Sequence, residues 1–172
     1  YGDWSSDVCS SDLEGIANHQ LCEPLGHDKK GLKVITESPV DYLKSVCEKH
    51  GLSSEKRALL GTAANMNYAA VESQEYRSLK VVAISTGGVE VNAGRAGDPA
   101  NLYEQDGKFI SANGEVDEPH GTINTIIIIN KELTHGAMVR SLITASEAKA
   151  AALQELAVNS RYSCGLATGT GT

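Results

Sequence analysis

The side chains best suited to chemistry lie in the last third of the chain, where a small hydroxyl group precedes a strongly apolar run. Thr122 follows Gly121 at the start of this run, and strand ends commonly open into ligand-binding clefts. Its hydroxyl could act as a nucleophile or a polar anchor, and the imidazole of His120 could serve as a general base. The alternatives are a threonine that simply favours β structure and a solvated loop histidine.

Two charged residues on one predicted helix are the next candidates. On a helical wheel Lys149 falls within the apolar stripe, whereas Glu147 lies nearly opposite, beside Arg140. An inward-facing ammonium costs free energy unless it is paired, so Lys149 could orient a carboxylate or stabilise an oxyanion. Alternatively, Lys149 reaches past neighbouring alanines to solvent, and Glu147 is a solvated acid paired with Arg140.

Glycine-rich segments hold the remaining candidates. The segment 86–99, TGGVEVNAGRAGDP, lets the backbone approach a ligand closely, but it matches neither the dinucleotide nor the phosphate-loop pattern. The small polar residues in such surroundings, each weak on its own, are Asn92, Asp98, Asn124, Thr168 and Thr170. The histidines and cysteines show no metal-ligand spacing, so we expect no metal site.

These residues require a strand and a helix to position them. The run 123–129 predicts a strand whose four isoleucines are buried between two covering layers, at the centre of a sheet. Thr134 is the predicted N-cap of a helix that continues to about Leu156. Its apolar side would hold Met138, Leu142, Ala145, Ala152, Leu153 and Leu156. With the strand-like SCGLATG segment that follows, this order predicts a crossover unit and the α/β class, with a mixed sheet, a buried central strand at 123–129 and covering helices.

The first half of the chain predicts further scaffold. A helix is expected from 39 to 50, with Ser38 as its N-cap and Gly51 as its stop signal. Its core-facing side would hold Val40, Leu43, Val46 and Cys47. Residues 59–64 and 79–85 are predicted strands, and Asp106-Gly107 predicts a hairpin turn.

Composition limits the classes of function. The 172 residues carry a formal net charge of −7 without a cluster of Lys and Arg, which disfavours nucleic acid as a partner. The longest apolar run, 126–129, is far too short to span a bilayer, so no membrane contact is expected. Outside residues 1–13 the sequence has three cysteines, Cys22, Cys47 and Cys164. An odd number without CxxC spacing fits a cytoplasmic protein, and assembly into an oligomer is compatible with the sequence.

The segment 3–13, DWSSDVCSSDL, resembles the in-frame translation of a sequencing adapter because it repeats one tripeptide. The alternative is a natural polar leader, but the basic region and apolar run of a targeting segment are both missing. We therefore interpret residues 1–13 as an artefactual leader and residues 14–172 as a single domain.

Five segments then occur in series: TAA at 62–64, AGDP at 96–99, GTIN at 121–124, LITASEAKAAALQEL at 142–156 and ATGTGT at 167–172. Together they resemble the adenosylcobinamide amidohydrolase family of corrinoid-salvage enzymes. The resemblance implies hydrolysis of the amide that joins adenosylcobyric acid to 1-amino-2-propanol. The corrinoid would be the small-molecule substrate, and no cofactor is expected.

The resemblance also suggests which residues form the site. We expect Thr122 to be the nucleophile or water anchor, Glu147 or His120 the base, and Asn124 with loop N–H groups the oxyanion donors. The residues expected to bind substrate are Thr86, Asn92, Asp98, Lys149, Thr168 and Thr170.

Three further expectations follow from the resemblance. A looser similarity to layered amidases that use a strand-initial Thr or Ser adds an αββα arrangement as one form of the α/β fold. The family pattern continues past TGTGT into an acidic residue and another strand, so we expect a domain incomplete at both ends and truncated at its C-terminus, which could leave it inactive. The rival hypothesis is a noncatalytic corrinoid-binding module associated with uptake.

Overall fold

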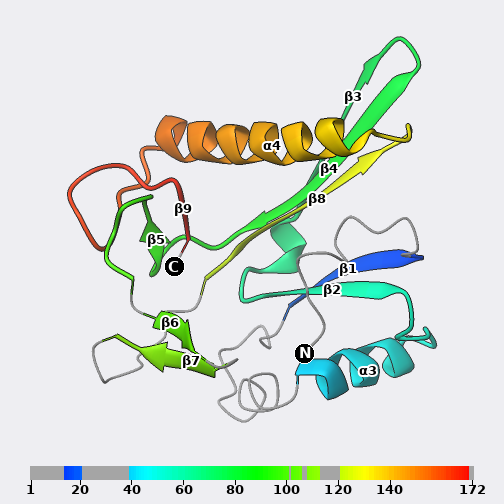
Figure 1. The fold of residues 1–172 in the computed structure, drawn as a ribbon, viewed down its shortest axis with the longest axis horizontal. Helices are drawn as coiled ribbons and strands as arrows, with labels where there is room; N and C mark the ends of the chain where they lie inside the picture. Colours follow the sequence, from blue (N-terminus) through cyan, green and yellow to red (C-terminus); the bar gives the residue numbers. More distant parts are fainter. Residues whose placement is uncertain (1–13, 21–38, 101, 106–107, 113–120, 171–172) are drawn as a thin grey trace.

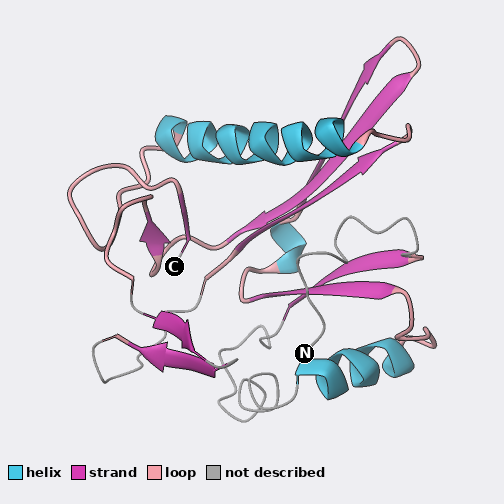
Figure 2. Cartoon of the chain, in the orientation of Figure 1, coloured by secondary structure: helices cyan, strands magenta, loops and turns pink. Residues whose placement is uncertain are grey.

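The computed structural model describes residues 14–20, 39–100, 102–105, 108–112 and 121–170. Within these ranges the elements, in chain order, are β1 (Gly15–Gln20), α3 (Pro39–Lys49), β2 (Arg57–Thr62), η1 (Met66–Tyr68), β3 (Ala70–Tyr76), β4 (Leu79–Gly87), β5 (Ala93–Gly94), β6 (Leu102–Gln105), β7 (Lys108–Ser111), β8 (Ile123–Ile129), α4 (His135–Glu155) and β9 (Gly169–Thr170). The mixture of helices and strands confirms the predicted α/β class (Figure 2).

β1 and β2 form a parallel pair, with α3 between them in the chain (Figure 1). Parallel strands cannot be joined by a tight turn, so a crossover of this kind is required. The predicted helix at 39–50 is confirmed as α3, and Gly51 follows it at φ +65°, the left-handed conformation that glycine commonly takes after a helix. On its predicted inner side Cys47 is buried and Val46 is half-buried. Ser38 lies outside the described residues.

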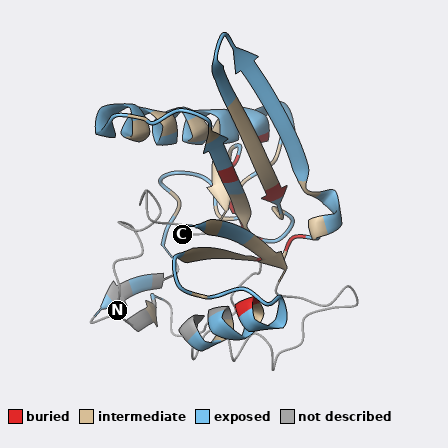
Figure 3. Ribbon diagram, turned by 90° about the vertical axis from the view of Figure 1, so that its right-hand side faces the viewer, coloured by how far each residue is buried: buried red, intermediate tan, exposed pale blue. Residues whose placement is uncertain are grey.

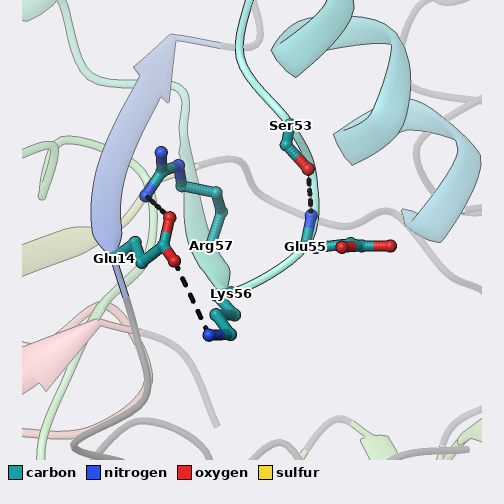
Figure 4. A network of polar contacts seen from close by, with 5 residues as sticks. All are labelled: Glu14, Ser53, Glu55, Lys56 and Arg57. Atoms are coloured by element: carbon teal, nitrogen blue, oxygen red, sulfur yellow. Dashed lines mark hydrogen bonds and ion pairs between the residues drawn. The ribbon is translucent and has the colours of Figure 1, made fainter.

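A polar network marks the point where β1 meets β2 (Figure 4). The N–H of Glu14 donates to the carbonyl of Lys56 at 2.8 Å. The Glu14 carboxylate lies 3.6 Å from Lys56 Nζ and 3.8 Å from Arg57 Nη1. Such exposed ion pairs add little stability, but a slip of one residue in register would turn every β1 side chain to the opposite face. The observed register therefore decides which way Asn18 points.

β4 is the centre of a three-stranded antiparallel sheet with the order β3-β4-β8. Among the described residues β8 pairs with β4 alone. Only Ile126 of its four consecutive isoleucines is buried, and Ile128 is 51% exposed. The structure thus differs from the expected central strand covered on both faces, because β8 lies at a sheet edge. An apolar run by itself does not distinguish the two positions.

β3 lies outside the strands predicted from the sequence. All seven of its residues are exposed, so it lacks the alternation that marks a half-buried strand. The turn that joins it to β4 contains Arg77 at φ +54°, a conformation more often held by glycine or asparagine. The β3–β4 hairpin extends away from the other elements (Figure 1).

α4 begins as predicted. Thr134 is its N-cap, and the Thr134 side chain accepts a hydrogen bond from the N–H of Ala137 at 3.3 Å. Its predicted apolar side is less buried than expected, since Leu142 and Leu156 are exposed and only Leu153 is buried. Most of the α4 ribbon is accordingly coloured as exposed or intermediate in Figure 3. The reason is that, among the described residues, the sheet beside the 21-residue helix α4 has only three strands.

The core beside α4 is small. Its buried residues are Ala93, Leu153 and Ala167, with Val89, Ile123 and Val158 packed against them. β9 pairs antiparallel with β5 and not with β8, so the predicted crossover over the last third is wrong for the described sheets. β6 and β7 form the predicted antiparallel hairpin, whose turn at 106–107 lies outside the described residues.

In Figure 1, α4 lies on one side of the three-stranded sheet, and the β1–β2 pair with α3 lies on the other. The four sheets of the described residues remain separate, so the αββα arrangement stays a prediction. Neither of the described α-helices is both long and apolar enough to cross a membrane.

Candidate functional site

Five polar side chains gather where β1 and β2 face β4 and β8. We name Asn18, Thr62, Thr86, Thr122 and Asn124 the amide–hydroxyl cluster. Thr62 and Thr86 are 1% and 2% exposed, and polar groups buried this deeply are almost always hydrogen-bonded. Thr86 pairs with Asn124 across the sheet, so the two side chains share a face, and strand alternation adds Thr122 to it.

Thr122 makes its hydrogen bond to a second hydroxyl. Its Oγ1 donates to Thr62 Oγ1 at 3.2 Å, and Thr62 Oγ1 also accepts from the N–H of Ala64 at 3.0 Å. Within the described part of the chain, no acidic or basic side chain bonds to the Thr122 hydroxyl. A nucleophilic role for Thr122 therefore requires a base that is not yet in contact with it.

Asn124 connects the two sheets. Its Nδ2 donates to Asn18 Oδ1 at 2.9 Å and to the carbonyl of Gly61 at 2.8 Å, while Asn18 Nδ2 donates to Thr86 Oγ1 at 2.8 Å. A side-chain amide has two N–H donors, so both are occupied in Asn124. To serve as the expected oxyanion donor, Asn124 would have to exchange one of these bonds for the substrate.

Asn92 holds the chain immediately before Thr122. Its Nδ2 donates to the carbonyl of Gly121 at 2.5 Å, and the N–H of Gly88 donates to the carbonyl of Thr122 at 2.9 Å. Asn92 is 5% exposed, and among the described residues its Oδ1 has no hydrogen-bond partner. The side chain thus positions the entry to β8, and the expected contact between Asn92 and substrate stays a prediction.

β8 divides the candidate residues between two faces. Ile123 points away from the amide–hydroxyl cluster and packs beside Leu153 of α4. A cavity of about 350 Å³ opens on this second side, lined by Gly94, Arg95, Ala96, Ile123, Lys149, Thr168, Gly169 and Thr170. We name it the Lys149 pocket. It brings together Lys149, Thr168 and Thr170, three of the predicted substrate-binding residues.

Lys149 extends from α4 toward β9. A Cβ atom built on Gly169 would lie 3.3 Å from Lys149 Nζ, so the absence of a side chain at Gly169 leaves room for the ammonium. Lys149 makes no hydrogen bond or ion pair within the described part of the chain. Thr168 Oγ1 accepts from the N–H of Ala96 at 2.9 Å, which keeps the Thr168 O–H free to donate.

Asp98 ties the loop after β5 to the segment after α4. Its Oδ2 accepts from the N–H of Arg95 at 2.7 Å and from the Ser160 hydroxyl at 2.7 Å, and its Oδ1 accepts from the Ser163 hydroxyl. Desolvation raises the pKa of Asp98, but the bonds from Ser163, Arg95 and Ser160 and the Arg95 charge outweigh it, leaving the pKa below the ordinary 3.8. These contacts support a structural role, and substrate binding by Asp98 stays a prediction.

The lowered pKa of Asp98 predicts an acid-sensitive contribution to stability. A carboxyl group with a depressed pKa in the folded state stabilises the fold above the unfolded pKa and loses this effect as pH falls through the folded pKa. We expect Asp98→Asn to have a lower melting temperature than the wild type at pH 7, with the gap closing below about pH 4. The melting temperatures of Asp98→Asn and the wild type are measured at each pH by circular dichroism. Glu132→Gln, at an exposed loop position, is the control. A difference in melting temperature between Asp98→Asn and the wild type that is the same at pH 7 and below about pH 4 would contradict the prediction.

Of the two proposed bases, only Glu147 lies within the described residues, and it makes no hydrogen bond to the amide–hydroxyl cluster. Glu147 is exposed on α4 and, among the described residues, makes neither the alternative ion pair with Arg140 nor a hydrogen bond. His120 lies outside the described residues. His19 follows Asn18 in β1 but faces α3, where its ring lies 6.0 Å from that of Tyr42. No group of three potential metal-binding side chains occurs in the described ranges.

A family model matches residues 6–172, and its description is adenosylcobinamide amidohydrolase. The chain belongs to the adenosylcobinamide amidohydrolase family. A relative is an uncharacterised protein of Methanocaldococcus jannaschii, 39% identical over 166 residues, which cover 94% of this chain and 62% of that protein. The chain thus spans less than two thirds of the length of this relative. No solved structure matches.

Two polar residues of this adenosylcobinamide amidohydrolase family member were not predicted as part of the site. Asn18 and Thr62 complete the amide–hydroxyl cluster, each from a strand distant in the chain from β8. Thr62 carried a signal, since it opens the TAA segment that contributes to the family resemblance. The sequence contains no signal for Asn18, because β1 has no strong apolar period. The direction of the Asn18 side chain depends on the pairing of β1 with β2.

Proposed function

We propose that this protein hydrolyses the amide of adenosylcobinamide to give adenosylcobyric acid and 1-amino-2-propanol, in cytoplasmic corrinoid salvage. The family membership over residues 6–172 carries the proposal. In the reaction, the oxygen of water is added to the acyl carbon as the C–N bond breaks, and the amine leaves with the transferred proton. The corrinoid is the substrate, and the proposal assigns no further cofactor.

The amide–hydroxyl cluster and the Lys149 pocket suggest which residues take part in catalysis and which bind the substrate. We assign Thr122 as nucleophile or water anchor, with Glu147 or His120 as its base, and Asn124 with loop N–H groups as oxyanion donors. Substrate binding is assigned to Thr86, Asn92, Asp98, Lys149, Thr168 and Thr170. The hydrogen bonds of Thr122 and Asn124 described above mean that substrate binding must rearrange the cluster before chemistry.

The direct test is chromatographic. Purified protein is incubated with adenosylcobinamide, and release of adenosylcobyric acid and 1-amino-2-propanol is followed over time. Formation of both products in equal amounts supports hydrolysis. Substrate that binds but stays intact would instead support the second candidate, a noncatalytic corrinoid-binding module. This candidate is favoured by the amide–hydroxyl cluster, because the Thr122 hydroxyl and both N–H donors of Asn124 already bond to protein groups.

Glu147→Gln separates the two proposed bases. If Glu147 removes the proton, the neutral amide should lower the rate of conversion by at least about 100-fold, the lower range for loss of a general base. The fold should be unaffected, because Glu147 is exposed and makes no hydrogen bond or ion pair in the described part of the chain. Glu155→Gln, also exposed on α4, is the matched control. A wild-type rate in Glu147→Gln would leave His120 as the assigned base.

A further inference from the structure

We infer that the Lys149 pocket is a carboxylate subsite, which holds the acid arm of the product more tightly than the amide arm of the substrate. This inference rests on the proposed function, because the proposed reaction converts a neutral amide into a carboxylate. It gives Lys149 a defined ligand, whereas the family resemblance suggests only that the residue contributes to the site.

The charge of the pocket supports an anionic ligand. The chain as a whole carries a formal charge of −7, yet the charged residues in the described part of the lining, Arg95 and Lys149, are both basic. The Arg95 guanidinium is partly engaged, because its Nη1 donates to the carbonyl of Cys164 at 2.9 Å. Of these two residues, Lys149 makes no hydrogen bond or ion pair within the described residues. Lys149 is exposed, so its ammonium is accessible to a ligand, and it forms a stronger hydrogen bond with an anion than with a neutral group.

The hydrogen-bond donors of the pocket agree with this ligand. Lys149 can only donate, and the Thr168 oxygen already accepts from the N–H of Ala96, so the Thr168 hydroxyl can offer its hydrogen. The Thr170 hydroxyl has no partner among the described residues and is free to donate as well. Side-chain carboxylates and amides, which could accept a hydrogen bond from an N–H donor, do not occur among the described residues that line the pocket. A ligand that presents acceptor oxygens therefore fits best.

The size of the pocket limits how much of the corrinoid can enter. A volume of about 350 Å³ is at the lower end of the range for small-molecule sites. A corrinoid macrocycle with its side arms is much larger, so only one arm fits and the ring must remain outside. The acid arm of the product, a short chain that ends in two acceptor oxygens, has the size and chemistry for the pocket.

The carboxylate is formed at the amide–hydroxyl cluster, on the other face of β8. Once bound in the Lys149 pocket it would be held by a charge-assisted hydrogen bond from Lys149, which is roughly twice as strong as a bond to a neutral amide. Release of the acid would then oppose turnover, and adenosylcobyric acid would inhibit the enzyme.

The test compares two probes that differ by one charge, adenosylcobyric acid and its methyl ester. Dissociation constants are measured by isothermal titration calorimetry with the full chain and three variants. Lys149→Met removes the charge at similar length, Lys149→Arg keeps it, and Lys131→Met is the control at an exposed position before α4. We expect the wild type to bind the acid at least about tenfold more tightly than the ester.

That preference should disappear in Lys149→Met and remain in Lys149→Arg and Lys131→Met. Equal binding of the two probes by the wild type, binding of neither probe, or a preference that survives in folded Lys149→Met would each overturn the inference. The conversion assay keeps the proposed function separate. Preference for the acid without hydrolysis would refute only the proposed reaction, and hydrolysis without preference would refute only the carboxylate subsite.

Discussion

Thr122→Ala should reduce the release of adenosylcobyric acid by at least about 100-fold, while the protein remains folded. The alanine removes the hydroxyl that is proposed to attack the amide or to anchor the attacking water. The structural cost should be small, because one hydrogen bond, to Thr62, is lost at about 1 kcal/mol. Thr62 keeps its bond from the N–H of Ala64. The rate is measured by chromatography and the fold by circular dichroism.

Thr125→Ala is the matched control for Thr122→Ala. Thr125 lies on the same strand but on its opposite face, and its hydroxyl is 2.8 Å from the hydroxyl of Ser85. The control therefore also loses one hydroxyl–hydroxyl hydrogen bond, which is exposed and so should cost no more stability than the part-buried bond of Thr122. It should convert adenosylcobinamide at close to the wild-type rate. Full activity in Thr122→Ala would remove Thr122 from the mechanism and move attention to the hydroxyls of the Lys149 pocket.

Gly121→Ala should be the most destabilising small substitution near the site. A Cβ atom at Gly121 would overlap Asn92 Oδ1 and would lie 2.5 Å from the carbonyl oxygen of Gly88. One obstacle is backbone and the other is a side chain only 5% exposed, so neither can move aside easily. Overpacking of this kind costs about 1–3 kcal/mol, and we expect the upper end. Since about 1 kcal/mol shifts the melting temperature of a domain this size by roughly 2–4 °C, the expected fall is about 6–12 °C.

Gly136→Ala provides a control of opposite sign. Gly136 lies in the first turn of α4, and a Cβ atom there would meet nothing within 4 Å. Alanine stabilises a helix relative to glycine by up to about 1 kcal/mol, so this variant should melt at the wild-type temperature or slightly above it. Thermal unfolding of both variants at one pH makes the comparison. A Gly121→Ala protein as stable as Gly136→Ala would show that the chain entering β8 is less tightly packed than described.

Several elements of the fold were predictable because their signals are local. The helix at 39–49 has a proline in its first turn and a glycine after its end, and α4 has a threonine N-cap, so both were placed correctly. The strands at 57–62 and 79–87 were recognised within two residues. β3 could not be recognised, because it is exposed throughout and its turn uses Arg77 in place of glycine.

The division of the candidate site between two faces of β8 could not be predicted. The sequence places Thr122, Asn124 and Lys149 close to one another in the last third of the chain. Strand alternation then turns Thr122 and Asn124 toward β1 and β2, while Ile123 faces the Lys149 pocket. Which side a helix packs on is a tertiary property, so the segment order alone does not reveal it. The partners Asn18 and Thr62 depend likewise on contacts between sheets.

The position of β8 at the edge of its sheet has a consequence for the folding of the chain. Along Ile123–Ile129 the strand contains no charged residue and no proline, and among the described residues only β4 pairs with it. Such an edge is a template for another extended segment, so intermolecular strand addition competes with correct assembly while chains are partly folded. Because Thr122 and Asn124 lie at the start of this strand, aggregation that begins there would trap the very residues assigned to catalysis.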